Sequence, residues 1–505
     1  MERKDGYVVD IEYVHGVHRD LGPSALNVIL LIQNIDPVAL RDGFTYCDVG
    51  CGQGDSVNLF AACHPEGEFH AIDFNAVHIA GARRLAGQAG LANSTFWEAN
   101  FADLGGLPLP AFDFIVMHGV YSWVGGEARR HILEFIRTKL KPGGVVYLSY
   151  NSLPGWSAHA PLRDLLISYA DTQSGPLEQR IDAAVEFVKR LKNAHAAIFE
   201  ATSSTGEFFE YIYTLPRNYL AHEFFNRDWD LFSHADVVRD LAGADVSFTG
   251  SASFVENQDM LRFSEAQQQI LNDVTDKVLR ETVKDSFVNL LLRRDLFTRG
   301  RTRMNSAVQL EYFLTRRFAV VVPLAHLERK AIFPIGEVLF DRNLYDPILS
   351  AFELKPQSAE ELLQCPKIRE QGMARVLEAL IVLLAAEYVM PAVEPPLEVV
   401  MATGKLNRAL LERDLDNSGT RFLASPVLQN AIRVEWLERL LIQCEIDGHP
   451  DPLSFVREKM ETHLYTLNNN GTILQEPEEI RSELSIRIEA FHTCMAPLLR
   501  QLGVL

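Results

Sequence analysis

The sequence predicts an α/β fold, with a mainly parallel sheet in its N-terminal part and mostly helical regions after it. Short apolar segments alternate with helical segments between residues 45 and 150, which is typical of sheets whose strands run parallel. A glycine-rich loop lies between the first of these strands and the helix that follows it. From about residue 155 onward, the apolar residues recur at helical spacing instead.

The N-terminal part should contain five strands that alternate with three helices. The sequence Lys-Pro-Gly-Gly at 141–144 is expected to form a turn that ends the third helix and precedes the fifth strand. The expected strands are 45–49, 68–73, 95–98, 112–118 and 145–150, and the expected helices are 55–62, 76–89 and 127–138.

The rest of the chain divides less clearly. One long helix is expected at about 265–296, and strands are expected to return near 309–322. Residues 345–392 indicate a small helical module that ends in a short strand. We therefore expect an N-terminal α/β domain at 1–165, a helical middle domain at 166–330, a winged-helix-like module at 331–400 and a C-terminal α+β region at 401–505.

Composition narrows the classes of partner. Among 505 residues, 67 acidic side chains outnumber 48 basic ones, and a formal charge of −19 disfavours binding to nucleic acid. None of the six cysteines forms a CxxC pair or a zinc-site spacing, which fits a reducing cytoplasm and predicts no metal. The N-terminus has no secretory apolar segment, and the apolar run at 379–386 is far shorter than the ~20 residues of a membrane span. We expect a cytoplasmic protein that acts on small molecules or basic protein segments.

The strongest functional signal is the loop after the first strand. Asp48 precedes glycines at 50, 52 and 54, and the helix begins directly afterwards. Dinucleotide-binding loops have the spacing G-x-G-x-x-G and bind a pyrophosphate, whereas Gly50, Gly52 and Gly54 follow the spacing G-x-G-x-G. A carboxylate beside this loop would repel a pyrophosphate but would attract the cationic amino-acid end of S-adenosylmethionine (SAM).

The ends of the next two strands extend the cofactor site. Asp73 ends the second strand and is placed to bind the ribose hydroxyls, and Phe74 is placed to cover the adenine. After the third strand, Asn100 and Phe101 are the preferred adenine contacts, with Asp103 as the alternative.

The methyl acceptor should meet the loops that follow the fourth and fifth strands, because ligands of open α/β sheets lie at the carboxyl ends of the strands. These loops supply His118, Tyr121 and Asn151 as candidate catalytic residues, with His118 or Tyr121 as a proton acceptor. His118 and Tyr13 are also candidates for cofactor binding. The alternative interpretation places Tyr121, Trp123 and Trp156 in the core.

Four motifs carry a resemblance to a known family: DVGCGQG at 48–54, HGVYSWV at 118–124, LKPGG at 140–144 and YNSLPGW at 150–156. With them the chain resembles class I methyltransferases that carry a methyltransferase regulatory domain, including bacterial enzymes that methylate lysines of outer-membrane proteins. The resemblance implies a Rossmann-like catalytic domain, a helical middle region, a winged-helix-type module and a protein lysine as acceptor. A small-molecule or glycan acceptor and a non-catalytic SAM-binding scaffold remain the alternatives.

Two further segments could be interpreted as nucleic-acid-binding. The module at 345–396 has four basic and eight acidic side chains, which argues against contacts to phosphates. The arginines at 293, 294, 299, 301 and 303 form a basic cluster that suits an acidic peptide, a sugar acid or RNA. We favour pairing of these arginines with acids of neighbouring domains.

Overall fold

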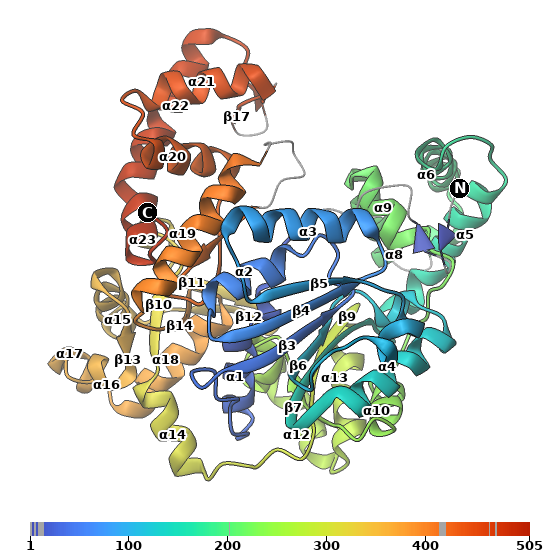
Figure 1. Ribbon diagram of the computed structural model, residues 1–505, viewed down its shortest axis with the longest axis horizontal. Helices are drawn as coiled ribbons and strands as arrows, with labels where there is room; N and C mark the ends of the chain where they lie inside the picture. Colours follow the sequence, from blue (N-terminus) through green and yellow to red (C-terminus); the bar gives the residue numbers. More distant parts are fainter. Residues whose placement is uncertain are drawn as a thin grey trace.

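The computed structural model describes residues 3–4, 7–8, 15–200, 203–413, 421–463, 465–469 and 472–505. A seven-stranded sheet lies at the centre of the molecule, with the C-terminal helices on one side and the helices of the middle region on the other (Figure 1). The strands are arranged in the order β5-β4-β3-β6-β7-β9-β8. Their bounds are Phe44–Val49 (β3), Gly67–Asp73 (β4), Ser94–Glu98 (β5), Phe112–Met117 (β6), Leu140–Asn151 (β7), Ser247–Ser251 (β8) and Leu292–Thr298 (β9).

The predicted alternation of strands and helices is confirmed. The first five strands of this sheet pair in parallel, and the helices α2 (Asp55–Cys63), α3 (Ala76–Ala89) and α4 (Gly126–Lys139) connect them. β7 begins earlier than expected, so the predicted turn at 141–144 lies inside the strand. The reason is that Gly143 and Gly144 exchange backbone hydrogen bonds of 2.7 and 3.0 Å with Arg299.

Helices cover both faces of the sheet and bury it. α1 (Pro23–Ile32), α2 and α3 pack on one face, where Leu30, Phe60 and Ala82 are fully buried. α4 and α10 (His234–Ala242) pack on the other face. Burial on both faces is why the central strands are almost continuously apolar.

The predicted long helix at 265–296 is wrong at its C-terminal end. The structure has α12 (Glu265–Asp273), α13 (Lys277–Val288) and then the strand β9. Asn289 adopts a left-handed conformation with φ of 52° and ends α13, and the next residues pair antiparallel with β7. The segment between the expected boundaries at 166 and 330 thus contributes both antiparallel strands, β8 and β9, to the seven-stranded sheet.

The middle region is otherwise helical, as predicted. Its helices surround one apolar cluster that includes Trp156, Leu166, Ile181 and Phe209, all of them buried. These helices are α5 (Ala160–Asp171), α6 (Leu177–Asn193), α7 (Ala197–Glu200), α8 (Ser203–Thr214) and α9 (Arg217–Phe224).

Gly155, directly after β7, should not tolerate any side chain. A Cβ atom there would lie 2.2 Å from the carbonyl oxygen of Leu290 and 2.8 Å from that of Asn289, and backbone atoms cannot move aside cheaply. We expect Gly155→Ala to cost about 3 kcal/mol or more, measured as a lower midpoint of thermal unfolding. Gly206→Ala is the matched control, because this helical glycine has open space around its Cβ position and should gain stability. Equal midpoints for the two variants would contradict the prediction.

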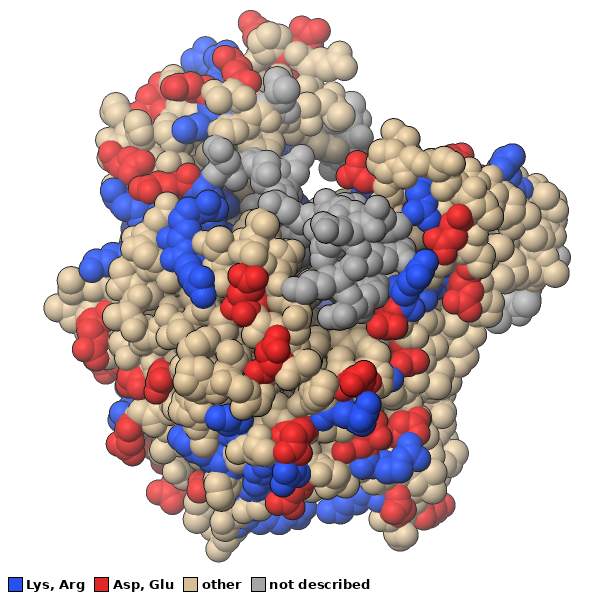
Figure 2. Space-filling view, turned by 45° about the vertical axis from the view of Figure 1, so that its right-hand side comes forward, with Lys and Arg blue, Asp and Glu red and all other residues tan. Residues whose placement is uncertain are grey.

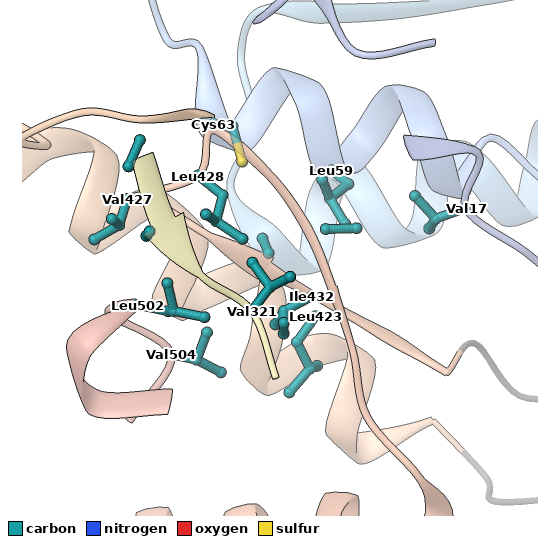
Figure 3. Packing of buried hydrophobic residues seen from close by; sticks show 14 of the residues in the cluster. Val17, Leu59, Cys63, Val321, Leu423, Val427, Leu428, Ile432, Leu502 and Val504 are labelled. Carbon is teal, nitrogen blue, oxygen red and sulfur yellow. The ribbon is translucent and has the colours of Figure 1, made fainter. Parts of the chain in front are cut away.

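The C-terminal part folds back onto α2. A three-stranded antiparallel sheet has the order β13 (Gln357–Ser358), β10 (Arg317–Val320), β14 (Val389–Ala392). It is followed by α19 (Leu397–Glu412), which lies across α2 and α3 (Figure 1). Figure 3 shows apolar side chains of this part, among them Leu423 and Ile432, gathered beside Leu59 and Cys63 of α2. The winged-helix-like module stays a prediction.

The remaining C-terminal elements have the following bounds: α14 (Ser306–Thr315), β11 (Lys330–Phe333), β12 (Gly336–Leu339), α15 (Arg342–Leu354), α16 (Ala359–Leu362), α17 (Pro366–Arg369), α18 (Met373–Ala385), β15 (Phe422–Ser425), β16 (Asn430–Arg433), α20 (Trp436–Asp447), α21 (Pro452–His463), β17 (Asn468–Asn469), β18 (Thr472–Ile473), α22 (Pro477–Ala490) and α23 (Ala496–Gln501). Within the ranges described above, no helix has both the length and the apolar character that a bilayer crossing requires.

Candidate active site

The glycine-rich loop connects β3 to α2 and needs glycine for two separate reasons. Gly50, Gly52 and Gly54 all have positive φ angles, of 86°, 53° and 70°, which other residues adopt only with strain. A Cβ on Gly50 would also lie 2.4 Å from Cγ2 of Val120, in the loop after β6. The glycine loop therefore lies directly against the exit of β6, where the acceptor was predicted to bind.

Asp73 organises this loop. Its Oδ2 atom accepts a hydrogen bond of 2.9 Å from the backbone N–H of Gly52, and its Oδ1 atom accepts one of 2.8 Å from that of Asn75. Each oxygen keeps a second lone pair, so the carboxylate can also accept hydrogen bonds from ribose hydroxyls.

Asp48 lies on the neighbouring strand and is buried beside Asp73. Burial and the nearby Asp73 carboxylate raise the pKa of Asp48 to about 8. A cationic group bound at the loop would favour the ionised form of Asp48 and would itself be stabilised by it.

The structure brings the adenine candidates to the same edge of the sheet. Asp73 and Glu98 are register partners on β4 and β5, so Phe74, Asn100 and Phe101 follow two adjacent strand ends. All three side chains are partly buried, whereas the alternative Asp103 is exposed. Tyr13 lies outside the described residues.

His118, directly after β6, begins a chain of hydrogen bonds that reaches the N-terminal segment. Its Nδ1 atom lies 2.8 Å from the hydroxyl oxygen of Tyr147, and this hydroxyl donates to Oδ2 of Asp20 at 2.9 Å. Arg294 lies 3.4 Å from the same carboxylate. Because the single hydroxyl proton of Tyr147 goes to Asp20, the Nδ1 atom of His118 must carry a proton, and Nε2 is the unprotonated nitrogen.

The imidazole of His118 is held in its neutral form. Burial, together with the neighbouring ring of His18, lowers the pKa of His118 to about 3. The two imidazoles lie 3.8 Å apart between ring centroids.

The sequence analysis did not identify two members of this hydrogen-bond chain. Tyr147 has the sequence pattern of a buried strand residue, and Asp20 lies 98 residues before His118.

Tyr121 and Asn151 have different surroundings. The buried hydroxyl of Tyr121 donates to Oδ2 of Asp240 at 2.9 Å, and burial with this carboxylate raises its pKa further. Tyr121 is therefore poorly suited to accept a proton. Asn151 is buried at the end of β7, and its Nδ2 atom has no hydrogen-bond partner in the described part of the chain.

Two tryptophans in the segments that follow β6 and β7 belong to a packed cluster. Trp123 and Trp156 are buried and lie 6.4 and 5.2 Å, respectively, from the ring of Trp229. Arg163 covers Trp229, with its guanidinium carbon 4.1 Å from a ring centroid. These contacts favour the core interpretation of both tryptophans.

The basic cluster at 293–303 is mostly structural. Arg293 is buried among acids, and Arg294 pairs with Asp20. Arg299 and Arg301 donate to backbone carbonyls, including those of Leu140 and Gly143. Acidic and basic side chains are mixed on the face shown in Figure 2.

The site fits the predicted cofactor. The loop offers carboxylates at Asp48 and Asp73, which suit a cationic ligand with free ribose hydroxyls, and polar and aromatic groups follow at Asn100 and Phe101. When bound, SAM supplies a methyl group on a positively charged sulfur.

Comparisons with known proteins agree with this geometry. A family model described as a methyltransferase domain matches residues 47–146, and one described as a predicted methyltransferase regulatory domain matches residues 216–299. The uncharacterized protein sll1526 of Synechocystis is 35% identical over 506 residues, which cover 100% of both chains. The chain belongs to this family of methyltransferases.

Two further comparisons concern the fold and the cofactor of the methyltransferase. PKMT2 from Rickettsia typhi, solved in complex with AdoHcy, superposes with a TM-score of 0.74 over 98% of this chain and 99% of its own, at 18% identity. Trans-aconitate 2-methyltransferase of Paracidovorax citrulli is 26% identical over 180 residues, which cover 32% of this chain and 66% of that enzyme. The methyltransferase is therefore SAM-dependent and has the Rossmann-like fold of this enzyme class.

Proposed function

We propose that this enzyme methylates lysine side chains of a protein. The observation that carries the proposal is the neutral His118, whose unprotonated Nε2 atom is fixed by Tyr147 and Asp20 beside the cofactor loop. The motifs at 118–124 and 150–156, which resemble those of bacterial lysine methyltransferases, support the same acceptor, and the fold is shared with PKMT2 over the full length of both chains.

The chemistry requires an amine with a free lone pair in line with the methyl group. The amine nitrogen forms a bond to the methyl carbon while the carbon–sulfur bond breaks, its electron pair stays on sulfur, and the amine proton leaves to solvent. We assign to His118 Nε2 the role of accepting a hydrogen bond from the amine, which orients the lone pair. A neutral ring suits this role because an imidazolium would repel the positive charge on the product nitrogen.

Asn151 supports the site as a second polar contact. Its unpartnered Nδ2 atom lies at the end of β7, next in the sheet to the strand that ends before His118. We propose that this Nδ2 atom donates a hydrogen bond to a carbonyl of the acceptor or to the cofactor.

The domain division at 165, 330 and 400, with a winged-helix-like module, is part of the same proposal. These later regions would bind the protein substrate.

The test uses poly-L-lysine as acceptor and SAM with a radiolabelled methyl group, followed by acid hydrolysis and chromatography of the amino acids. We expect label in methylated lysine, and we expect His118→Gln to lower kcat by about 10²-fold while SAM binds as before. Tyr147→Phe should lower kcat by about tenfold, because the ring stays but the tautomer is no longer fixed.

The pH profile distinguishes this role from catalysis by a titrating histidine. Since the pKa of His118 is about 3, kcat/KM should rise steadily toward the lysine pKa of about 10.4, without a step near 6.5. Poly-L-lysine whose side-chain amines have been blocked is the matched control, and it should take up no label. A SAM-binding protein that labels neither poly-L-lysine nor any lysine-bearing protein would refute lysine methylation and favour a hydroxyl acceptor or a scaffold.

A further inference from the structure

The first residue after the glycine loop is bound by two residues from distant parts of the chain. Asp55 opens α2, and its Oδ2 atom lies 2.8 Å from Nδ1 of His15, in the N-terminal segment. Its Oδ1 atom accepts a hydrogen bond of 2.8 Å from Nη1 of Arg413, which follows α19 in the C-terminal region. The three side chains form one cluster at the end of the cofactor loop.

The cluster is buried and charged. The Asp55 side chain is only 1% exposed, compared with 23% for Arg413 and 27% for His15. Burial alone would raise the pKa of Asp55, but the hydrogen bond with His15 and the charge of Arg413 hold it below its usual value. Asp55 is therefore ionised at neutral pH, and it keeps the Arg413 guanidinium in place.

Arg413 has capacity for another acceptor. Its Nη1 atom contacts Asp55 and lies 3.4 Å from Nδ1 of His15, while its Nε and Nη2 atoms make no hydrogen bond to any residue that the structure describes. A guanidinium presents five N–H donors in a planar fork that matches a carboxylate. Among the residues that the structure describes, this side of the fork therefore has no competing acceptor for a carboxylate ligand.

The cofactor brings such a group to this end of the loop. The methionine part of SAM carries both an ammonium and a carboxylate, and Asp48 and Asp73 supply negative charge for its cationic groups. Its carboxylate needs a cation, and Gly54, at the N-terminus of α2, is followed directly by the Asp55–Arg413 pair. α19 packs across α2 and α3 (Figure 1). Arg413, directly after this helix, thereby contacts Asp55 although 358 residues separate the two in sequence.

We infer that Arg413, held by Asp55 and His15, binds the carboxylate of the methionine end of SAM, so that the C-terminal region completes the cofactor site. The inference concerns binding of the cofactor and is independent of the acceptor.

The experiment measures dissociation constants by calorimetry for SAM, AdoHcy and 5′-methylthioadenosine with the full chain. 5′-Methylthioadenosine has the same nucleoside and sulfur but lacks the amino-acid carboxylate. We expect Arg413→Gln to weaken SAM and AdoHcy at least tenfold and 5′-methylthioadenosine less than twofold, and Arg413→Lys to weaken the first two by a smaller factor.

Arg408→Gln is the matched control, because Arg408 lies on α19, the helix that Arg413 follows, is 57% exposed and pairs with Asp447 at 3.5 Å. It should leave all three constants unchanged. Two outcomes would overturn the inference. Unchanged SAM affinity in Arg413→Gln would show that the guanidinium does not touch the ligand. An equal loss for all three ligands would show that Arg413 only supports the loop, and thermal unfolding of each variant would separate this from misfolding.

Discussion

Asp73→Ala should weaken SAM binding strongly while the protein stays folded. The carboxylate holds the backbone N–H groups of Gly52 and Asn75, and it is the side chain that we assign to the ribose hydroxyls. Hydrogen bonds to charged groups contribute about 1.5–3 kcal/mol each, so losing several of them lowers affinity by about 10²–10⁴-fold. The measurement is calorimetric titration of SAM and AdoHcy into wild type and the variant.

Asp103→Ala is the control for this prediction. Asp103 is an exposed acid at the neighbouring strand end and was the alternative to Asn100 as an adenine contact. We expect the control variant to bind SAM like wild type. If Asp103→Ala lost affinity and Asp73→Ala kept it, the assignment of both carboxylates would have to be exchanged.

The cofactor half of the site could be predicted because its determinants are local in sequence. Asp48 and the glycines at 50, 52 and 54 lie within seven consecutive residues, and Asp73 ends the next strand. Parallel strands align their carboxyl ends, so adjacency along the sheet follows from the order of elements. The same argument placed His118 near the loop. The structure agrees, because Val120, two residues after His118, lies directly against Gly50 of the loop.

The residues that complete the site could not be predicted, because long-range packing brings them together. Asp20, Tyr147 and Arg294 meet around His118 although they are separated by up to 274 residues. Arg413 and Asp55 are 358 residues apart. Neither hydrophobic periodicity nor a local motif in the sequence indicates which distant residues will pair in this way.

Strand β9 was missed for a related reason. Arg293, Arg294 and Asp295 lie within a segment that continues a helical pattern, and charged residues in succession indicate a solvated surface. In the structure they belong to a strand in the interior of the sheet, where Arg293 and Asp295 are buried. Pairing of the charges makes their burial possible, and only the fold shows the pairing.

Asp295→Ala should therefore cause a large loss of stability. The Asp295 carboxylate is fully buried and accepts hydrogen bonds from the Tyr150 hydroxyl at 2.7 Å and from Nε of Arg293 at 3.0 Å, and it lies 3.1 Å from Nδ1 of His234. Removing one partner of a buried pair costs about 3–5 kcal/mol, because the other charge stays buried. The measurement is the free energy of unfolding in denaturant. Glu134→Ala, in the exposed pair with Arg137, is the control and should leave the midpoint unchanged.

The effect should depend on pH in a defined direction. Burial opposes ionisation, but the charge of Arg293 and the hydrogen bond with His234 hold the pKa of Asp295 well below its usual range. A lowered native pKa contributes stability that is complete above the unfolded-state pKa of about 3.9 and is lost as the pH falls toward the native value. The difference between wild type and Asp295→Ala should therefore be constant from pH 5 to 8 and shrink below about pH 4.

An unchanged stability would be informative about β9. Arg293 also binds Asp285 and Glu281, so these two carboxylates would then be sufficient to neutralise it. In that case the backbone ladder between β7 and β9 would hold the middle region to the catalytic sheet, and the buried acid would serve to set the register of the strand. A large loss shows instead that the paired charges stabilise this junction, on the same strand that places Arg294 beside Asp20.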